Sequence, residues 1–302
     1  MKLPVLFLAT LLAVTGCAAD PAETSSRSDR RERAVHRSTP GGDGSVSPEG
    51  SEPLDEPSDS DGSTFAAAVY YLGDTERAGV RLYREFRPGT GDRVAGTLAL
   101  LMTSPRDPDY RTAWEPGMLE DAAVVGDRIE VVVAPAATER PDGMSTVAAR
   151  QAVQQVVYSL QAAAQQRLPV QFTTGSGPAG QVLGVPTPGP VRQGSPLQVL
   201  SHVSLTSPEQ GAAAGDTLRV SGVGNSFEAS LGWEIRQGSR VVDRGYATTD
   251  GWMEDTLFPF ETSVDVSGLE PGSYTLWVTT DDPTGGTEGS GAMTDDREFT
   301  VG

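Results

Sequence analysis

Cysteine and histidine are nearly absent from this chain of 302 residues, which has one cysteine and two histidines. A lone thiol, Cys17, forms neither an internal disulfide nor a cysteine-based metal site. A Ser-His-Asp triad would depend on His202, because His36 lies in a segment without a folded pattern and no serine lies in a Gly-x-Ser-x-Gly motif. We therefore expect no catalytic residue, no metal and no cofactor, and we expect His202 to be a partly buried polar residue.

Positive charge is scarce as well. Lys2 is the only lysine, and the formal net charge is −18 at pH 7. A polyanion of this kind repels nucleic acid and has no basic stripe that would neutralise phosphates. Nucleic-acid binding is therefore excluded from the functions considered below.

Long apolar runs are limited to one, from Leu3 to Val14, directly after Lys2. It is shorter than the roughly 20 residues of a membrane-spanning helix, and its position is typical of a secretory signal. Four residues at its end resemble the lipobox of bacterial lipoproteins: Val14, Thr15, Gly16 and Cys17. The resemblance implies that residues 1–16 are a signal peptide and that the Cys17 sulfur carries acyl chains, such as palmitate, that anchor the chain to the membrane.

Residues 17–64 contain hardly any large apolar side chains and are rich in Ser, Pro, Gly and charge. Such a segment does not bury enough apolar surface to offset its ordering entropy, so we expect a disordered linker. Its arginines lie near Cys17, from Arg27 to Arg37, and six of its acids lie farther along, from Glu49 to Asp61. The linker would hold the folded part away from the bilayer.

Residues 65–185 mix strand and helix patterns, which predicts an α+β domain with two helices on a small sheet. Strands are expected at 65–74, 80–86, 127–135 and 168–174. Asp92 and Ser145 each precede an apolar stripe of helical spacing and are expected to cap a helix. Five glutamines lie outside the stripe of the second helix: Gln151, Gln154, Gln155, Gln161 and Gln165.

Residues 186–196 are rich in proline and glycine and are expected to link two domains. Residues 197–302 alternate apolar and polar side chains, which predicts an all-β sandwich of about seven strands. A hairpin is expected to turn near residues 237–239. Tyr274 lies in a Leu-x-Pro-Gly-x-Tyr pattern that resembles the tyrosine corner of immunoglobulin-like sandwiches.

Two longer resemblances cover most of the folded part. Residues 65–185, with VYYL, LALLMTSP, EPG and LPVQFTT in this order, resemble a GerMN domain of the sporulation and germination type. Residues from about 199 to 301 resemble the immunoglobulin-like domain of bacterial spore germination, through Ser207-Pro208, LRVSGVGNSFEASLGWEI, FPFETSVDV and REFTV. These resemblances imply an extracytoplasmic lipoprotein whose modules bind or position other envelope components without a catalytic centre.

Candidate binding residues come from the second domain: Trp252, Asn225 and Glu228. Trp252 lies in a turn-like segment from which its ring could stack on a sugar, whereas strand tryptophans are more often core or sheet-face residues. Phe227 is expected in the core, and Glu228 is expected to pair or cap locally. Binding by these residues and a purely structural role both remain open here.

Acidic residues leave two further alternatives. A pair of carboxylates could hydrolyse glycosidic bonds, and the candidates are Glu115, Glu120 and Asp121, although solvated surface acids are the commoner interpretation. The acidic, glycine-rich loop 281–296, with Asp295 and Asp296, could bind calcium or could simply be solvated. The regular ligand spacing of a calcium loop is missing.

We therefore expect a lipid-anchored, non-catalytic binding or scaffold protein at the outer face of the cytoplasmic membrane. Its partners would be the membrane, through the lipid anchor, and an envelope protein or peptidoglycan. The alternative is a peptidoglycan-binding module or a wall hydrolase.

Overall fold

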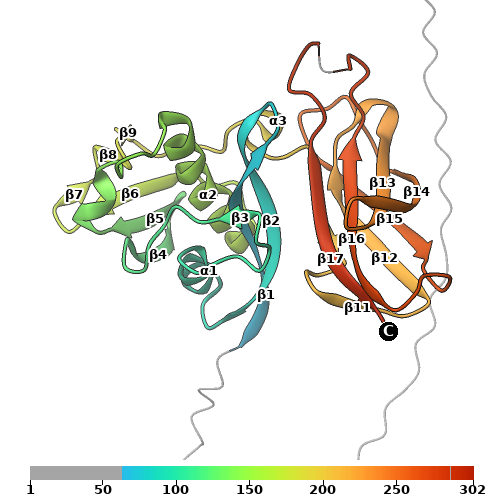
Figure 1. Ribbon diagram of the computed structural model, residues 1–302. Coiled ribbons are helices and arrows are strands. Elements are labelled where there is room, and N and C mark those ends of the chain that lie inside the picture. The colour runs from blue at the N-terminus through green and yellow to red at the C-terminus, as the bar shows by residue number, and fades with distance from the viewer. Residues whose placement is uncertain (1–62, 286) are drawn as a thin grey trace, which may run out of the picture. The chain divides into compact units, whose positions relative to one another are not determined.

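A computed structural model describes residues 63–285 and 287–302 (Figure 1). The expected signal peptide, the lipidation residue Cys17 and almost all of the expected linker lie outside these residues. The described part has two hydrophobic cores, one within residues 67–200 and one within residues 203–299. We term residues 63–200 the first region and residues 201–302 the second region. No helix in the described part combines the length and the apolar character needed to span a bilayer.

The first sheet of the first region is a long hairpin with a short third strand. Strands β1 (Thr64–Thr75) and β2 (Gly79–Thr90) pair antiparallel, and β3 (Tyr110–Arg111) pairs with the other edge of β1. The hairpin turns at Gly79, whose φ of 71° is a left-handed conformation that favours glycine.

A second sheet has the strand order β4-β5-β6-β7. Its strands are β4 (Leu119–Val125), β5 (Arg128–Val133), β6 (Val170–Thr174) and β7 (Gly177–Pro178). Strands β5 and β6 are parallel, and their connection contains the 3-10 helix η1 (Pro135–Thr138) and the helix α2 (Thr146–Ala164). A parallel pair needs such a crossover, so the sequence between these strands is long and helical.

The two predicted helices of this region begin where the sequence predicts. Helix α1 (Arg93–Leu101) is capped by the Asp92 carboxylate, which accepts hydrogen bonds of 2.9 Å from two backbone N–H groups. Helix α2 is capped by the Ser145 hydroxyl, which accepts from the backbone N–H of Ala148 at 3.1 Å. Each cap satisfies N–H groups that the first turn leaves without an intrahelical partner.

Helix α2 is more enclosed than its apolar stripe alone requires. The stripe residues are buried as predicted, and three glutamines outside the stripe, Gln151, Gln155 and Gln161, are buried as well. Ser159 accepts a 2.9 Å hydrogen bond from the backbone N–H of Tyr70 in β1. The helix therefore packs against more than one neighbour, and its polar residues serve tertiary contacts rather than solvent.

The proline- and glycine-rich segment after the second sheet packs on the first region. It follows the small pair β8 (Gln181–Val182) and β9 (Val185–Pro186). Val191 forms two backbone hydrogen bonds with Val170 of β6, at 2.7 and 2.8 Å. The short helix α3 (Pro196–Val199) then leads to Leu200, which belongs to the core of the first region.

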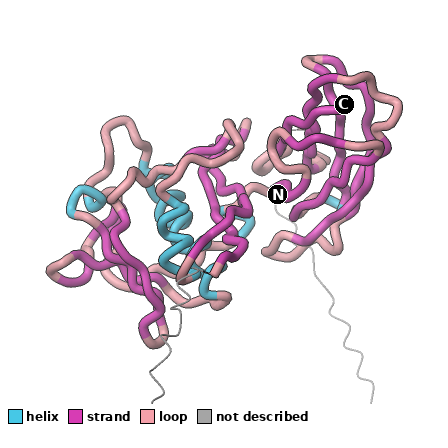
Figure 2. Tube along the Cα trace, turned by 90° about the horizontal axis from the view of Figure 1, so that it is seen from below, coloured by secondary structure: helices cyan, strands magenta, loops and turns pink. Residues whose placement is uncertain are grey.

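The second region consists of two sheets and is mostly strand, with loops between the strands (Figure 2). One sheet contains β10 (Val203–Ser207), β12 (Thr217–Gly224) and β15 (Phe258–Asp265). The other has the order β11 (Ala212–Ala214), β17 (Thr294–Val301), β16 (Gly272–Thr280), β13 (Ser230–Gln237) and β14 (Arg240–Thr248). The predicted fold class, an α+β part followed by an all-β sandwich, is thus confirmed.

Several details of the sandwich were also expected. The β13–β14 hairpin turns at Gly238, whose φ is 59°. The Tyr274 hydroxyl donates a 2.7 Å hydrogen bond to the carbonyl oxygen of Glu270, which is the contact that defines a tyrosine corner. Along β16, Tyr274, Leu276 and Val278 are buried while Trp277 lies on the opposite face, so the predicted period of two holds.

Two expectations for the second region are wrong. Phe227 is 43 % exposed, because it lies in the 3-10 helix η2 (Phe227–Ala229), at the edge of the sandwich rather than in a strand. Asp295 and Asp296 belong to strand β17 and not to a loop, and Asp295 is buried. The start of this strand was not predicted, because buried carboxylates interrupt the apolar alternation that indicates a strand.

Candidate functional site

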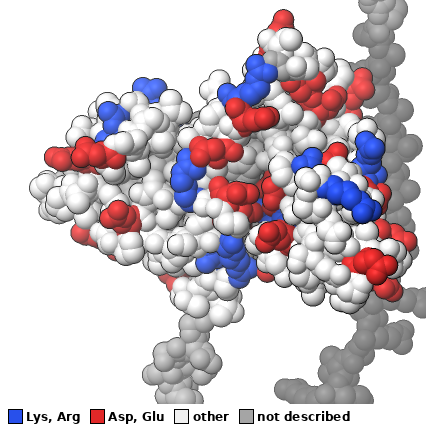
Figure 3. Space-filling model, in the orientation of Figure 1, with Lys and Arg blue, Asp and Glu red and all other residues white. Residues whose placement is uncertain are grey.

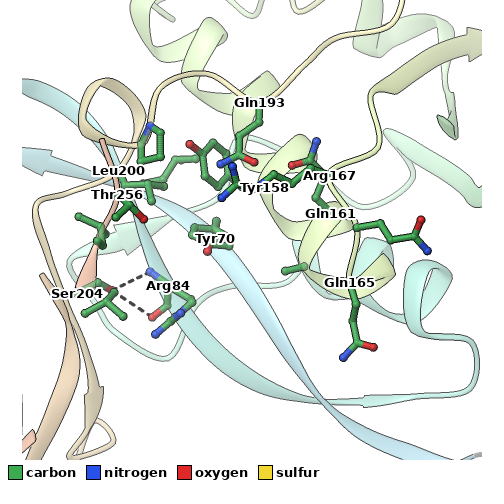
Figure 4. Close-up of a pocket in the computed structure, with 16 residues that line it drawn as sticks. Tyr70, Arg84, Tyr158, Gln161, Gln165, Arg167, Gln193, Leu200, Ser204 and Thr256 are labelled. Carbon is green, nitrogen blue, oxygen red and sulfur yellow. Dashed lines mark hydrogen bonds between the residues drawn. The ribbon is translucent and has the colours of Figure 1, made fainter. Parts of the chain in front are cut away.

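A cavity of about 390 Å³ is lined by residues of both regions (Figure 4). We term it the shared cavity; its main polar residues are Tyr70, Arg84, Tyr158, Gln161, Arg167 and Gln193. The second region contributes Ser204 of β10, Val223 of β12 and the pair Thr256 and Leu257. The volume falls within the roughly 300–1,000 Å³ of typical small-ligand sites.

The end of helix α2 supplies one wall of the shared cavity. Gln165 caps the helix in a left-handed conformation with φ 54°, and the Gln161 amide group donates a 2.7 Å hydrogen bond to the carbonyl oxygen of Leu168. The chain therefore turns sharply after the last helical residue. This turn places Gln161, Gln165 and Arg167 together beside the cavity (Figure 4).

Two tyrosines supply the adjoining wall. The rings of Tyr70 and Tyr158 lie 5.3 Å apart between centroids, and the Tyr158 hydroxyl donates to the carbonyl oxygen of Gly194 at 2.8 Å. Burial raises the pKa of Tyr158 to about 12 and also raises the pKa of Tyr70. Both hydroxyls are therefore neutral at physiological pH, and the bond to Gly194 uses the single donor proton of Tyr158.

Two buried polar atoms of the lining have no partner. The Gln161 side chain is 6 % exposed, and its Oε1 accepts no hydrogen bond. The Nε of Arg84 is also buried without an acceptor, although the same guanidinium donates to the Thr206 hydroxyl at 3.3 Å. Both atoms are almost completely inaccessible to solvent, so their missing hydrogen bonds are a cost to the fold of about 1–3 kcal/mol each and do not face a ligand.

The charge of the shared cavity contrasts with that of the chain. Arg84 and Arg167 line it, and none of the described residues that line it carries a carboxylate. Elsewhere, acidic and basic side chains are interspersed, as on the face shown in Figure 3.

A neighbouring groove shares Gln161 and Arg167 with the shared cavity and is also lined by Arg192 and Asp255. Hydrogen bonds from the Ser195 hydroxyl and a backbone N–H hold the pKa of Asp255 low.

A second polar cluster also joins the two regions. Arg297 of β17 donates to Asp107 and, at 2.8 Å, to Asp295, and it donates to the Tyr110 hydroxyl at 3.1 Å. All four side chains are buried. Burial raises the pKa of Asp107 to about 7 in spite of the neighbouring Arg297 guanidinium. Every member has a partner, so the cluster fastens the regions together instead of awaiting a ligand.

Comparison with protein-family models gives a match for each region. Residues 68–178 match the model described as sporulation and spore germination. Residues 202–287 match the immunoglobulin-like domain of bacterial spore germination. Neither the curated proteins nor the solved structures contain a match to this chain. The two family matches confirm the germination type of both predicted modules, which we now term the sporulation-type domain and the immunoglobulin-like domain.

The candidate binding residues of the immunoglobulin-like domain lie apart from the shared cavity lining. The Asn225 amide donates to the carbonyl oxygens of Glu254 and Thr256, at 2.8 and 2.7 Å. Asn225 therefore holds the loop that brings Thr256 to the cavity. Glu228 is exposed and adopts a left-handed φ of 53° in η2.

Trp252 forms a small exposed aromatic patch with Phe227. Trp252 is 37 % exposed, and its ring meets the Phe227 ring edge-on at 5.4 Å between centroids. The patch is thus available to a ligand from solvent.

The residues considered for hydrolysis or metal binding have other surroundings. Glu115, Glu120 and Asp121 of the sporulation-type domain are all exposed. His202 is partly buried, as expected, with Nε2 2.9 Å from the carbonyl oxygen of Leu197, and burial lowers its pKa. In the described part of the chain, loop 281–296 included apart from Gly286, no three His, Cys, Asp or Glu side chains group as a metal site would require.

The shared cavity was not predicted from the sequence. The glutamines and Arg167 at the end of α2 were a possible signal, because polar side chains concentrated at one helix end often serve a site. Arg84 lies in a strand and Ser204 in the other domain, and no local pattern connects them with α2.

Proposed function

We propose that this chain is a lipoprotein with a GerMN-type domain, anchored through Cys17 to the outer face of the cytoplasmic membrane. It binds and positions other components of the cell envelope and breaks no covalent bond. The observation that carries the proposal is the lining of the shared cavity, where amides, hydroxyls and guanidinium groups from both domains converge. These groups bind by hydrogen bonding and charge, whereas general acid–base hydrolysis relies on groups that exchange protons near neutral pH.

Two further findings support a binding role. Both domains match germination-type models, so the chain combines two modules of the same biological type. The buried cluster around Arg297 fastens the domains, which keeps the cavity walls in place before a partner arrives. A preformed site loses less conformational entropy on binding than a site that must assemble.

The anchoring is tested by comparing the full-length chain with its Cys17→Ala variant in a bacterial host. We expect the wild-type protein to enter the detergent phase on phase separation and to carry the mass of its acyl chains. The variant should stay in the aqueous phase without added mass. Equal partitioning and an unmodified Cys17 sulfhydryl in the wild-type protein would refute the anchoring.

The non-catalytic role is tested on purified peptidoglycan with a wall hydrolase as positive control. We expect the full-length protein to release no soluble fragments above the buffer background. If the protein released soluble fragments, and the Glu120→Gln, Asp121→Asn double variant did not, the protein would be a wall hydrolase and the proposal would be wrong.

Glycan binding is a second candidate, favoured by the exposed ring of Trp252 beside Phe227. Retention of the protein on insoluble wall, lost in Trp252→Ala and kept in Tyr246→Ala, would support it. Tyr246 is a suitable control because it is an aromatic residue of the same domain and is 78 % exposed. Equal retention of both variants would remove Trp252 as the binding residue.

A further inference from the structure

The arginines of the shared cavity lack counter-charges. Seven other described arginines form ion pairs with aspartate or glutamate: Arg87, Arg106, Arg111, Arg128, Arg219, Arg236 and Arg297. Arg84 and Arg167 form none within the described residues, a property that they share with other arginines such as Arg240. They differ in lining one cavity together, and no described residue of its lining carries a carboxylate. Their guanidinium groups favour a ligand that brings its own negative charge.

The amides of the cavity call for a ligand with both hydrogen-bond donors and acceptors. Gln161 and Gln165 lie at the end of α2, and Gln193 lines the same cavity as Tyr158. Gln165 is exposed and Gln193 is partly buried, so both amide groups are accessible from solvent. A glutamine amide pairs with a peptide group through one donor and one acceptor.

The remaining wall of the cavity is apolar. Leu82, Leu200 and Leu257 line it together with Pro196 and Val223. Small aliphatic side chains would bury their surface there, and sugar hydroxyls would lose hydrogen bonds to water. The volume of about 390 Å³ limits the occupant to the end of a chain rather than a long segment.

Taken together, we infer that the shared cavity binds the end of a peptide that carries a free C-terminal carboxylate and small apolar side chains. The carboxylate pairs with Arg84 and Arg167, and the terminal peptide groups pair with Gln165 and Gln193. This inference rests on the proposed binding function and assigns its ligand chemistry. Such an end occurs on a protein chain, with L residues, and on the stem peptides of a bacterial wall, with D residues.

The test uses the full-length chain in detergent and titration calorimetry with four probes. Two are N-acetyl-L-Ala-L-Ala and N-acetyl-D-Ala-D-Ala with free carboxylates, and two are the same peptides ending in a carboxamide. We expect at least one acid to bind about tenfold or more tightly than its amide, the effect of one charge-assisted hydrogen bond. Preference for the L or the D acid identifies the source, and either preference supports the inference.

Variants decide whether the effect comes from the cavity. Arg167→Gln should reduce the preference for the acid about tenfold, because Arg167 is exposed and its replacement leaves the fold intact. Arg240→Gln is the matched control, an exposed arginine of β14 outside the cavity lining. Arg84→Gln should act like Arg167→Gln, with unchanged thermal unfolding showing that the domains remain folded.

Three results would overturn the inference: equal binding of acid and amide, no binding of any probe, or the same loss in Arg240→Gln as in Arg167→Gln. None of these results would contradict the proposed anchoring or the proposed absence of wall hydrolysis. The Cys17→Ala and peptidoglycan experiments test those two proposals separately. If wild type and Arg167→Gln captured an envelope partner equally well, the protein would still have a binding role, but its binding site would not be the shared cavity.

Discussion

The hydroxyl of Tyr110 donates a 2.5 Å hydrogen bond to Oδ1 of Asp295, across 185 residues of sequence and between the two domains. The other carboxylate oxygen of Asp295 accepts from the backbone N–H of Leu205, and Arg297 donates to Oδ1. Of these three donors Tyr110 alone belongs to the other domain, so its hydrogen bond to the buried carboxylate forms only while the domains stay together. The cluster therefore couples the stability of the domain contact to the stability of both domains.

Removal of the arginine from this cluster is expected to destabilise the protein strongly. Arg297→Met keeps the length of the side chain but leaves Asp107 and Asp295 buried without a cation. Breaking a buried ion pair in this way costs about 3–5 kcal/mol of unfolding free energy. Urea unfolding followed by circular dichroism measures the change.

The matched control for this prediction is Arg219→Met, which breaks the pair between Arg219 and Glu261. Both side chains of that pair are more than half exposed, at 65 % and 57 %. A surface ion pair contributes about 0–1 kcal/mol, so the control should unfold close to the wild type. Equal losses in the two variants would show that the buried cluster has no special importance.

The unfolding free energy is expected to depend on pH through the titration of Asp296. Burial, together with the nearby Asp109 and Asp295 carboxylates, raises the pKa of Asp296 from 3.8 to about 6. The unfolded chain therefore loses this proton at lower pH than the folded chain. The contribution of Asp296 to stability is complete below pH 3.8, declines as the pH rises to about 6, and is fully lost above that.

Asp296→Asn is expected to remove this decline. Relative to the wild type, the unfolding free energy of the variant should rise between pH 3.8 and about 6 and then stay constant. Asp243→Asn, an exposed residue of β14, makes the same charge change as a control. A difference between Asp296→Asn and wild type that is the same at every pH would contradict the prediction.

A methyl group at Gly222 is expected to separate two strands of the sandwich. A Cβ atom there would lie 2.3 Å from the carbonyl oxygen of Ser204 in β10 and 2.9 Å from the Phe260 ring in β15. Gly222→Ala should therefore lower the unfolding free energy by about 1–3 kcal/mol, the usual cost of overpacking. Because Ser204 also lines the shared cavity, ligand binding should weaken with it.

Gly232→Ala is the control for Gly222. Its added Cβ atom would lie 3.5 Å from the nearest atom outside its neighbours, a methyl group of Thr279, which is ordinary contact. Thermal unfolding of the two variants side by side gives the comparison. If Gly222→Ala unfolds at the same temperature as Gly232→Ala, the close strand packing described here is wrong.

Local chemistry made much of the fold predictable. Asp92 and Ser145 cap the helices that their positions predict, because N-cap preferences depend on the residue and its neighbours alone. The Tyr274 corner is equally local, since the hydroxyl reaches a carbonyl four residues away. The period of two placed most strands of the sandwich for the same reason.

Features that depend on tertiary contacts were not predictable. Gln155 and Gln161 are polar but buried, because strands distant in sequence enclose α2. Asp295 is buried because Tyr110 and Arg297 satisfy it, and only one of these lies nearby in the chain. The shared cavity likewise needs both domains, and its arginines stand in unrelated segments. Patterns within a segment carry no information about such pairings.

The central claim is that the shared cavity is where an envelope partner binds. Photo-crosslinking in intact cells tests it, with p-benzoylphenylalanine replacing exposed Gln165 at the cavity or exposed Arg240 on β14. The account predicts a crosslinked product from position 165 alone, reduced when Arg167→Gln is added. The same products from both positions, or a product from position 165 that Arg167→Gln leaves unchanged, would contradict it.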